Sequence, residues 1–273
     1  MSEAQLRYGI AVPNWGQGSN PRAIGELARA AEVAGWDGYF TWDALPVGAS
    51  PPPTYDPFLS LALAAVATTR IRIGTCILVV PRYAPHLLAL RMANLDVLSG
   101  GRVILGVGIG DKAATFAAFG EPGSARVRAE QLDETLEIVH RLWTGERVVH
   151  AGTHFTIDGF TLNPTPVQTP RIPIWVGGDS PAALARAARW DGWIGPDQDP
   201  FTATVADLAA VRTAIREQRA TAALFDLAWA GPIGTAPGQR PHDFASAGAT
   251  WLITPAVGDR TTVVRQVADG PQR

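Results

Sequence analysis

Short apolar runs alternate with longer amphipathic segments along almost the whole chain. The apolar runs are typical of strands buried on both faces of a sheet, and the amphipathic segments carry apolar residues three and four positions apart, as helices do. The pattern predicts strands at Tyr8–Val12, Gly38–Trp42, Ile71–Val80, Arg102–Val107, Ile172–Val176, Gly192–Ile194, Asp226–Ala230 and Thr250–Ile253. It predicts helices at Pro21–Ala34, Pro57–Ala67, His86–Leu98, Arg126–Leu142, Ala182–Arg189, Thr202–Arg219, near Phe244, and at Thr261–Val267. About eight strand–helix pairs follow one another, which is the number that closes a TIM (β/α)8 barrel.

One segment, residues 144–171, interrupts this alternation. Two β-like arms flank Ala151-Gly152, as in a hairpin, and the prolines of Asn163–Pro170 favour an extended return to the core. We therefore expect a single domain over residues 1–273, a TIM barrel with a hairpin and loop inserted between the fourth and fifth units. A doubly wound open sheet is the alternative, although it usually has fewer units and a more regular nucleotide-binding fingerprint.

A glycine-rich stretch at residues 98–111 reads Leu-Ser-Gly-Gly-Arg-Val-Ile-Leu-Gly-Val-Gly-Ile-Gly-Asp. Gly100 and its neighbours predict the end of a helix, because glycine adopts the left-handed conformation at little cost. Gly106, Gly108 and Gly110 remove side chains from the carboxyl end of the next strand, so a planar ligand can lie against bare backbone there. Tight turns are the alternative use of such glycines.

The composition narrows the class of protein. The chain has 273 residues, of which 47% are hydrophobic and 18% charged, and this supports one large core. A net charge of −2 without basic clusters argues against nucleic acid as the main partner. The single cysteine excludes an internal disulfide and a cysteine zinc site, and it suits a reducing compartment. The first residues predict no secretion signal, and no apolar stretch is long enough to span a bilayer, so we expect a cytoplasmic protein without a membrane partner.

In a TIM barrel the active site lies at the carboxyl ends of the strands, so the residues directly after each predicted strand are the candidates. Asp111 is a candidate general acid or base if burial raises its pKa, with an ordinary helix-start acid as the alternative. His86 is a candidate donor to a substrate, with a structural role as the alternative. His150 and His154 share a strand face but have no evident third ligand, so no metal site is expected.

The segment Gly177-Gly178-Asp179-Ser180-Pro181 is a candidate anion site. Its glycines permit close approach of the backbone, Ser180 is a good helix cap, and exposed amides at a helix start favour a phosphate. An ordinary helix cap without a ligand is the alternative. Near the second strand, Asp43 is a candidate acceptor for a cofactor, or else a solvated strand-end aspartate, and Trp15 and Trp42 are expected to wall an apolar pocket.

With these motifs assembled, the chain resembles the bacterial luciferase-like family of flavin- or deazaflavin-dependent oxidoreductases. The resemblance covers nearly the whole length and rests on the motifs at Ala31–Asp43, Ala67–Thr75, Leu98–Gly108, Arg128–Glu137, Pro173–Gly178 and Ala247–Trp251. It implies a barrel that binds FMN or coenzyme F420 at its carboxyl-end mouth. It also implies a small-molecule substrate, which reacts either with O₂ in a monooxygenase or by hydride transfer.

The resemblance also implies the residues of the cofactor site, which are Asp43, Cys76, Ile77, Val79, Gly108, Gly110, Ala114, Gly177, Gly178 and Ser180. Many relatives have a non-proline cis peptide at the position of Cys76–Ile77. Many also carry a histidine where this chain has Ala44, so the acid role falls to Asp111 or His86, or the reaction needs no protein acid there.

Four questions stay open at this point. No group of basic residues is evident near Lys112 or Gly177 for the long anionic tail of a deazaflavin, yet the Asp43 and Cys76–Ile77 pattern is similar to the deazaflavin branch. A non-catalytic flavin-binding protein and a phosphate-handling barrel enzyme are the alternatives to a redox enzyme. Relatives are commonly dimers, and the apolar Leu59–Ala67 segment is a candidate contact for a homodimer. The segments at 46–55 and 146–169 are expected to cover the pocket, and they do not identify the substrate.

Overall fold

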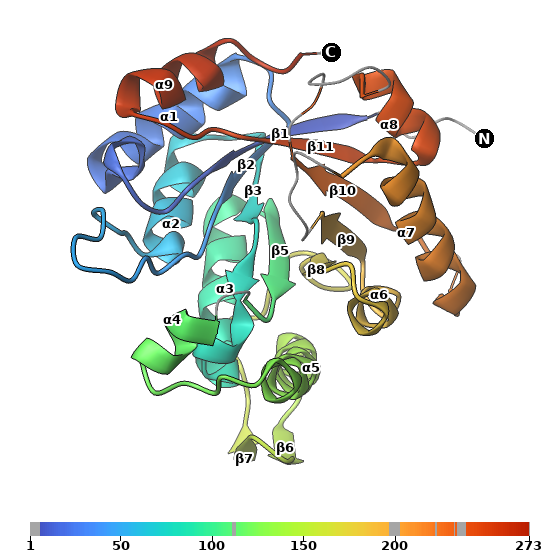
Figure 1. Cartoon of the computed structure of the whole chain (residues 1–273). Coiled ribbons are helices and arrows are strands. Elements are labelled where there is room, and N and C mark those ends of the chain that lie inside the picture. Colours follow the sequence, from blue (N-terminus) through green and yellow to red (C-terminus); the bar gives the residue numbers. More distant parts are fainter. Residues whose placement is uncertain are drawn as a thin grey trace.

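The computed structural model describes residues 6–110, 113–196, 203–221, 223–231, 233 and 239–272. Within them, parallel strands form a closed barrel in the order β3-β2-β1-β11-β10-β9-β8-β5, and β5 pairs back with β3 (Figure 1). The barrel strands are β1 (Arg7–Val12), β2 (Gly38–Thr41), β3 (Arg72–Thr75), β5 (Val103–Gly108), β8 (Ile174–Gly177), β9 (Gly192–Gly195), β10 (Asp226–Ala230) and β11 (Trp251–Pro255). The predicted TIM barrel is confirmed.

Helices surround the barrel, close to where the sequence predicts them (Figure 1). They are α1 (Pro21–Val33), α2 (Pro57–Ala67), α3 (Pro85–Ser99), α5 (Ala125–Trp143), α6 (Pro181–Ala187), α7 (Val205–Gln218), α8 (Pro241–Ala247) and α9 (Arg260–Ala268). The short helix α4 (Ala113–Ala118) and the 3-10 turns η1 (Gln17–Ser19) and η2 (Val80–Arg82) were not predicted. In the part of the chain that the structure describes, no helix combines the length and apolar character needed to cross a bilayer.

The third strand of the barrel is interrupted. Its first part, β3, pairs with the start of β5, and its second part, β4 (Leu78–Val79), pairs with the end of the same strand. The break falls at Cys76–Ile77, whose peptide bond is cis. The prediction of one continuous strand over Ile71–Val80 is therefore wrong at these two residues, whereas the cis peptide that the family resemblance implies is present.

The interior of the barrel is filled by a separate layer of apolar side chains. Its aromatic members are Phe40, Trp175 and Trp251, whose ring centroids lie 5.5 to 5.8 Å apart. Layers of large side chains from alternate strands fill TIM barrels in this way. The layer closes the barrel, so a ligand that enters at the carboxyl end meets an apolar floor.

Arg102 joins two helix ends beneath the barrel wall. Its buried guanidinium donates to the backbone carbonyls of Ala65 (2.8 Å), Ile71 (2.8 Å) and, through Nε, Ser99 (2.7 Å). Gly100, which follows α3, has φ +67°, so the predicted left-handed helix end is confirmed. The arginine of this motif thus satisfies carbonyl groups that α2 and α3 leave without helical partners.

The inserted segment forms the predicted hairpin, β6 (Val148–Ala151) paired antiparallel with β7 (Thr156–Phe160). It packs beyond α5, on the side away from the barrel (Figure 1). Glu134 of α5 accepts hydrogen bonds from Nε2 of His150 (2.9 Å) and from the backbone amides of His154 (2.9 Å) and Phe155 (2.8 Å). These bonds hold the hairpin on the outer side of the helix, so the expectation that this insertion covers the pocket is wrong.

Candidate active site at the barrel mouth

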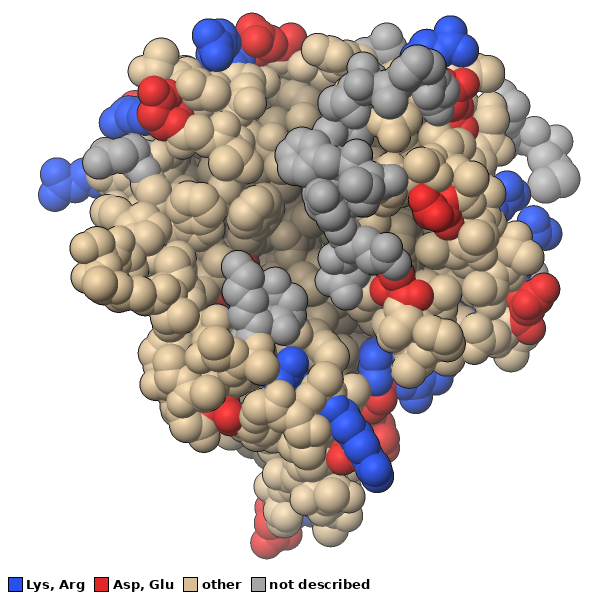
Figure 2. Space-filling view, in the orientation of Figure 1, with Lys and Arg blue, Asp and Glu red and all other residues tan. Residues whose placement is uncertain are grey.

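Two adjoining cavities open at the carboxyl end of the barrel, where Figure 2 shows the surface hollowed. The outer cavity has a volume of about 980 Å³ and extends from β2 to α5 and α6. The inner chamber has a volume of about 180 Å³ and is lined mainly by strand ends. They share the lining residues Trp42, Cys76, Ile77, Gly177 and Gly178. The two cavities therefore form one continuous space with a wide part and a narrow part.

Most of the residues predicted for the cofactor site line the outer cavity. These are Asp43, Cys76, Ile77, Val79, Gly108, Gly110, Gly177, Gly178 and Ser180. Ala114 is exposed on α4 and is not among the lining residues, whereas the next two residues, Thr115 and Phe116, line the cavity. His86 is exposed in the first turn of α3 and also lies outside the lining. Asp111 falls outside the described residues.

The glycines of the fourth unit make room for the strand break. A Cβ atom on Gly106 would lie 2.2 Å from the carbonyl oxygen of Thr75, and one on Gly108 would lie 2.0 Å from Cδ1 of Ile77. On the other side, a Cβ on Gly177 would lie 3.1 Å from the same Ile77 atom. The sequence analysis predicted that a planar ligand lies against the bare backbone of these glycines. In the structure, Thr75 and Ile77 occupy the space beside these glycines. The wall of the site therefore consists of the Ile77 side chain supported by glycine backbone.

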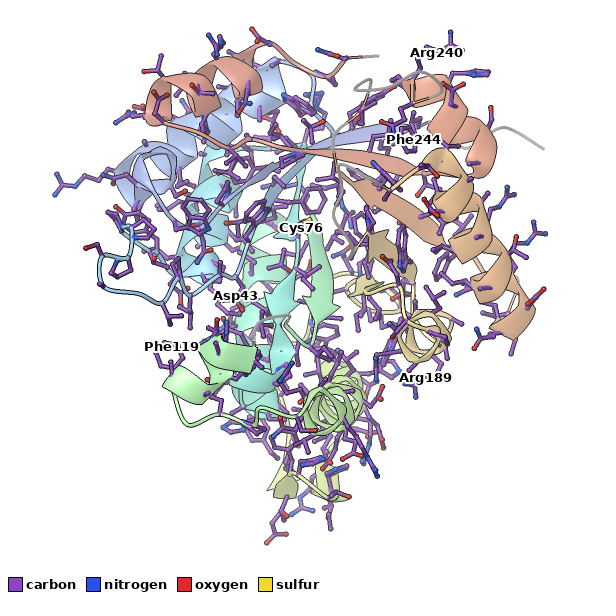
Figure 3. The ribbon with its side chains drawn as sticks, viewed as in Figure 1. Asp43, Cys76, Phe119, Arg189, Arg240 and Phe244 are labelled. Atoms are coloured by element: carbon purple, nitrogen blue, oxygen red, sulfur yellow. The ribbon has the colours of Figure 1, made fainter. Side chains whose placement is uncertain are left out.

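Asp43 is a buried acid at this wall, with an exposed fraction of 6% (Figure 3). Its carboxylate accepts a hydrogen bond from the backbone amide of Val79 (2.9 Å) and one from the hydroxyl of Tyr83. Burial raises the pKa of Asp43 above its ordinary value, although these two bonds and the charge of Arg82 oppose the shift. Burial and the Asp43 carboxylate also raise the pKa of Tyr83. Asp43 is therefore not a solvated strand-end aspartate, and it retains a proton to higher pH than a free one.

The loop after β2 is fixed by Asn14, a residue that the sequence analysis did not single out. Its Oδ1 accepts from the amide of Ala44 (2.8 Å), and its Nδ2 donates to the carbonyls of Ala44 (3.0 Å) and Tyr55 (3.0 Å). Ala44 thus lines the outer cavity with a methyl group that exchanges no proton. Trp15 and Trp42 stand beside it with their rings edge to face, and both line the cavity as expected.

The Gly177–Ser180 turn caps α6. Ser180 Oγ accepts a hydrogen bond from the amide of Ala183 (3.2 Å), so the predicted helix cap is confirmed. Gly178 has φ +113°, and a Cβ there would lie 2.8 Å from Cβ of Ala183. Its carbonyl accepts from Nε1 of Trp193 (3.0 Å). Packing alone therefore requires glycine at this position, and the phosphate-binding role of the turn stays a prediction.

Charged side chains from two helices gather at the α5–α6 end of the outer cavity. Arg126, Glu130, Asp133 and Arg186 all line it. Arg186 donates twice to Asp133 (2.8 Å each), and Arg189 also bonds to this carboxylate. Burial raises the pKa of Asp133, but the bonds and charges of Arg186 and Arg189 have the larger effect and hold this pKa below its usual value. The sequence analysis found no cluster of basic residues near Gly177, whereas the structure brings Arg126 and Arg186 to the same cavity as the Gly177–Ser180 turn, each paired with a carboxylate.

The family model for luciferase-like monooxygenases matches residues 7–242. The chain belongs to the luciferase-like family. Its F420-dependent relatives include a hydroxymycolic acid dehydrogenase of Mycobacterium tuberculosis, 35% identical over 175 residues, which cover 63% of this chain and 48% of that protein. An F420-dependent glucose-6-phosphate dehydrogenase of Microbacterium testaceum is 34% identical over 205 residues, which cover 72% of this chain and 59% of that protein.

The alignments to these luciferase-like relatives span about half to two thirds of the relatives' length. Solved structures are similar over almost the whole chain. The coenzyme F420 dependent tetrahydromethanopterin reductase from Methanopyrus kandleri superposes with a TM-score of 0.76 at 18% identity, covering 97% of this chain and 98% of that one. Monooxygenase RslO1 from Streptomyces bottropensis gives 0.73 at 23% identity, covering 96% of each chain. At these identities the structural likeness shows the fold alone.

Proposed function

We propose that this protein is an oxidoreductase that binds coenzyme F420 in the outer cavity and exchanges hydride between that cofactor and a small organic substrate. The observation that carries the proposal is the continuity of the outer cavity from the Ile77 wall and Asp43 to the arginines of α5 and α6. Its volume of about 980 Å³ is at the upper end of the range of roughly 300–1,000 Å³ for small-molecule sites. The F420-dependent relatives support the same assignment.

The residues present suit a ligand with a flat ring and an anionic tail. Ile77, backed by Gly108 and Gly177, offers an apolar wall for the ring, and Asp43 supplies a buried hydrogen-bonding group beside it. At the other end, the Ser180 turn and Arg126 face the same space. Cations and helix-start amides are the groups that bind phosphates and carboxylates. When bound, a deazaflavin accepts or donates hydride, whereas reduced FMN reacts with O₂.

Few residues near the cavity are candidates for the group that donates a proton to the substrate or accepts one from it. Ala44 has no titratable group, and the exposed position of His86 gives its expected role no support. Asp111 directly follows Gly110, which lines the cavity, and we keep it as the candidate acid. Replacement of Asp111 by Asn is expected to lower turnover with little effect on cofactor affinity, and an unchanged turnover would remove Asp111 from the mechanism.

FMN with O₂ is the second candidate, and one observation favours it. Arg186 already binds Asp133, and Arg126 binds Glu130 (2.9 Å), so the free positive charge at this end of the cavity is small. A small free charge suits the single phosphate of FMN better than a long polyanionic tail. A non-catalytic flavin-binding protein is the remaining possibility that Ala44 allows.

The deciding experiment is a titration of the purified protein with F420 and with FMN, each oxidised and reduced, followed by ring absorbance and fluorescence. Tighter binding of F420 supports the proposal, and tighter binding of reduced FMN supports oxygen chemistry. Binding without turnover under any reductant would indicate the non-catalytic protein. Binding of neither cofactor would overturn the proposal.

We also propose a cytoplasmic homodimer joined through α2. This helix has no charged residue, and Leu59 and Val66 on it are 48% and 66% exposed; Leu87 of the adjoining helix α3 is exposed too. An apolar surface of this kind is typical of a contact between subunits. Analytical ultracentrifugation is expected to show a dimer, and Val66→Glu is expected to yield a monomer with the same far-UV circular dichroism. A monomeric wild-type protein would contradict the proposed contact.

A further inference from the structure

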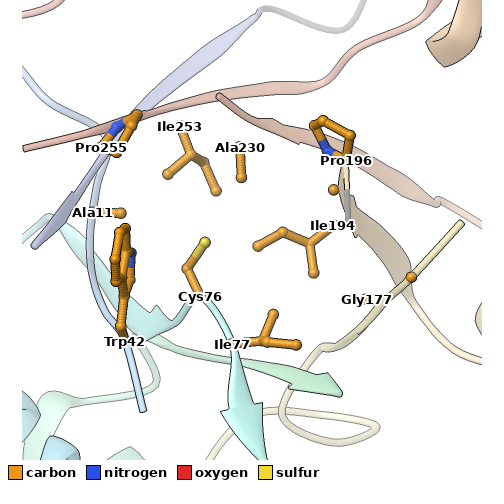
Figure 4. Close-up of a pocket in the computed structure, with 12 residues that line it drawn as sticks. Ala11, Trp42, Cys76, Ile77, Gly177, Ile194, Pro196, Ala230, Ile253 and Pro255 are labelled. Atoms are coloured by element: carbon orange, nitrogen blue, oxygen red, sulfur yellow. The ribbon is translucent and has the colours of Figure 1, made fainter. Parts of the chain in front are cut away.

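The described side chains that line the inner chamber are uncharged and mostly apolar (Figure 4). Its walls are Trp42, Cys76, Ile194, Ala230, Ile253 and Pro255, together with backbone of the flanking strands. None of its described lining residues carries a charge, and the thiol of Cys76 points into the space. The volume of about 180 Å³ is close to that of an engineered apolar cavity of about 150 Å³ that binds benzene. The chamber thus has room for one small ring or a short chain.

The loops that follow β8, β9, β10 and β11 contain no positively charged residue. Between the ends of β8, β9, β10 and β11 and the next helices, the sequences at 178–180, 196–204, 231–239 and 256–259 contain no Lys, Arg or His. Arg240, which begins the following helix, binds Asp243 (3.3 Å). The described lining of the chamber and the sequences of these loops therefore supply no cation for an anionic group.

A phosphate or carboxylate group would lose its hydration in such a chamber without gaining a cation from the lining. From this we infer that the inner chamber binds the uncharged, predominantly apolar part of the substrate, and that the substrate is a small neutral alcohol or carbonyl compound. The inference excludes sugar phosphates, although one relative is named for glucose 6-phosphate. The inference rests on the proposed function for the kind of reaction. It concerns substrate binding, so a binding measurement tests it independently of turnover.

The test uses three molecules that share one ring and differ in charge: cyclohexanol, cyclohexanecarboxylate and cyclohexylamine, with glucose 6-phosphate as a fourth. Binding of each is measured by calorimetry and ligand-observed NMR, with and without saturating F420 or FMN. Cyclohexanol is expected to bind at least about tenfold more tightly than the carboxylate, since burial of an unpaired charge is costly. Glucose 6-phosphate is expected not to compete with it. Preference for the carboxylate, the ammonium ion or the sugar phosphate would overturn the inference.

Two variants show whether the binding takes place in this chamber. Ala230→Phe fills the space and is expected to weaken cyclohexanol binding at least about tenfold, whereas the nearly isosteric Ala230→Ser is expected to retain it. Cofactor affinity is measured on the same samples. If Ala230→Phe removes cofactor binding as well, the chamber holds the cofactor ring and the inference is wrong. If neither cofactor binds the wild type but the order of the ring compounds holds, the proposed function fails and the chamber assignment stands.

Discussion

Ile77 occupies the space that a side chain on Gly108 would need, because an added Cβ would lie 2.0 Å from the Cδ1 atom of Ile77. Ile77 lies in the break between β3 and β4, whereas Gly108 is the last residue of β5, and their motifs are distant in the sequence. The break in the third strand directs Ile77 toward the mouth, and the glycine of the fourth strand admits it. The strand break and the glycine-rich stretch are therefore two parts of one wall.

This relationship predicts a rescue experiment. Gly108→Ala is expected to displace Ile77, lower cofactor affinity at least about tenfold, and reduce the free energy of unfolding by about 1–3 kcal/mol through overpacking. The double variant Gly108→Ala with Ile77→Ala removes the clash, so it is expected to be less destabilised than the sum of the two single variants. Denaturant unfolding and cofactor titration of the two single variants and the double variant measure this coupling. Strictly additive effects would show that the two residues do not interact.

The anion-binding role of the α6 start is best tested at Ala182, which is exposed and lines the outer cavity. Gly178 is unsuitable, because any side chain there meets Ala183 and requires φ +113°. Ala182→Glu is expected to weaken cofactor binding about tenfold by repulsion, whereas Ala182→Gln, which has the same size, is expected to change it little. Equal effects of Glu and Gln on the dissociation constant would indicate that no anion binds at this helix start.

The raised pKa of Asp43 predicts a pH dependence. Because burial raises this pKa above 3.8, the folded protein holds the proton more tightly than the unfolded chain. The contribution of Asp43 to the free energy of unfolding therefore decreases as pH rises from 3.8 through the raised value. Asp43→Asn keeps an acceptor for the Val79 amide and does not titrate, so the stability of the wild type relative to this variant should fall over that interval. Urea unfolding of both proteins across pH checks this, and a constant difference would contradict it.

Glu134 is expected to control the docking of the hairpin. Burial raises its pKa, but the bonds from His150 and from the amides of His154 and Phe155 outweigh this effect and lower it below 4.5. The stabilisation by its carboxylate is therefore present above pH 4.5 and is lost as the pH falls through the lowered value. Glu134→Gln is expected to weaken the docking by about 1–3 kcal/mol, seen as faster hydrogen exchange in β6 and β7. Glu137→Gln, at an exposed position of the same helix, serves as the control. Equal exchange in the two variants would remove Glu134 from this role.

The barrel was predictable because every unit repeats the same alternation of buried strand and amphipathic helix. The helix end at Gly100 was predictable for a local reason, since its conformation favours glycine. By contrast, the break at Cys76–Ile77 interrupts an apolar run without any change in polarity, and only the family resemblance indicated it. The direction of His86 depends on how α3 packs against its neighbours, which sequence position does not specify.

The charged end of the site was missed for a related reason. Arg126 and Asp133 belong to α5 and Arg186 to α6, so the group exists only once the two helices lie side by side. The spacing of Arg126, Glu130 and Asp133 on one side of α5 was the available signal. Glu134 gave no comparable signal, because the amides that it binds lie in the inserted hairpin.

The position of Cys76 gives the unmodified protein a built-in reporter. It is the single cysteine of the chain and lines both cavities, so a thiol reagent would mark this place and no other. Burial raises the pKa of its thiol to about 12, so labelling at neutral pH should be slow and easily timed. Any molecule that fills the chamber should slow it further. The rate of modification of this one sulfur atom would then rank large collections of compounds by how well they occupy the chamber.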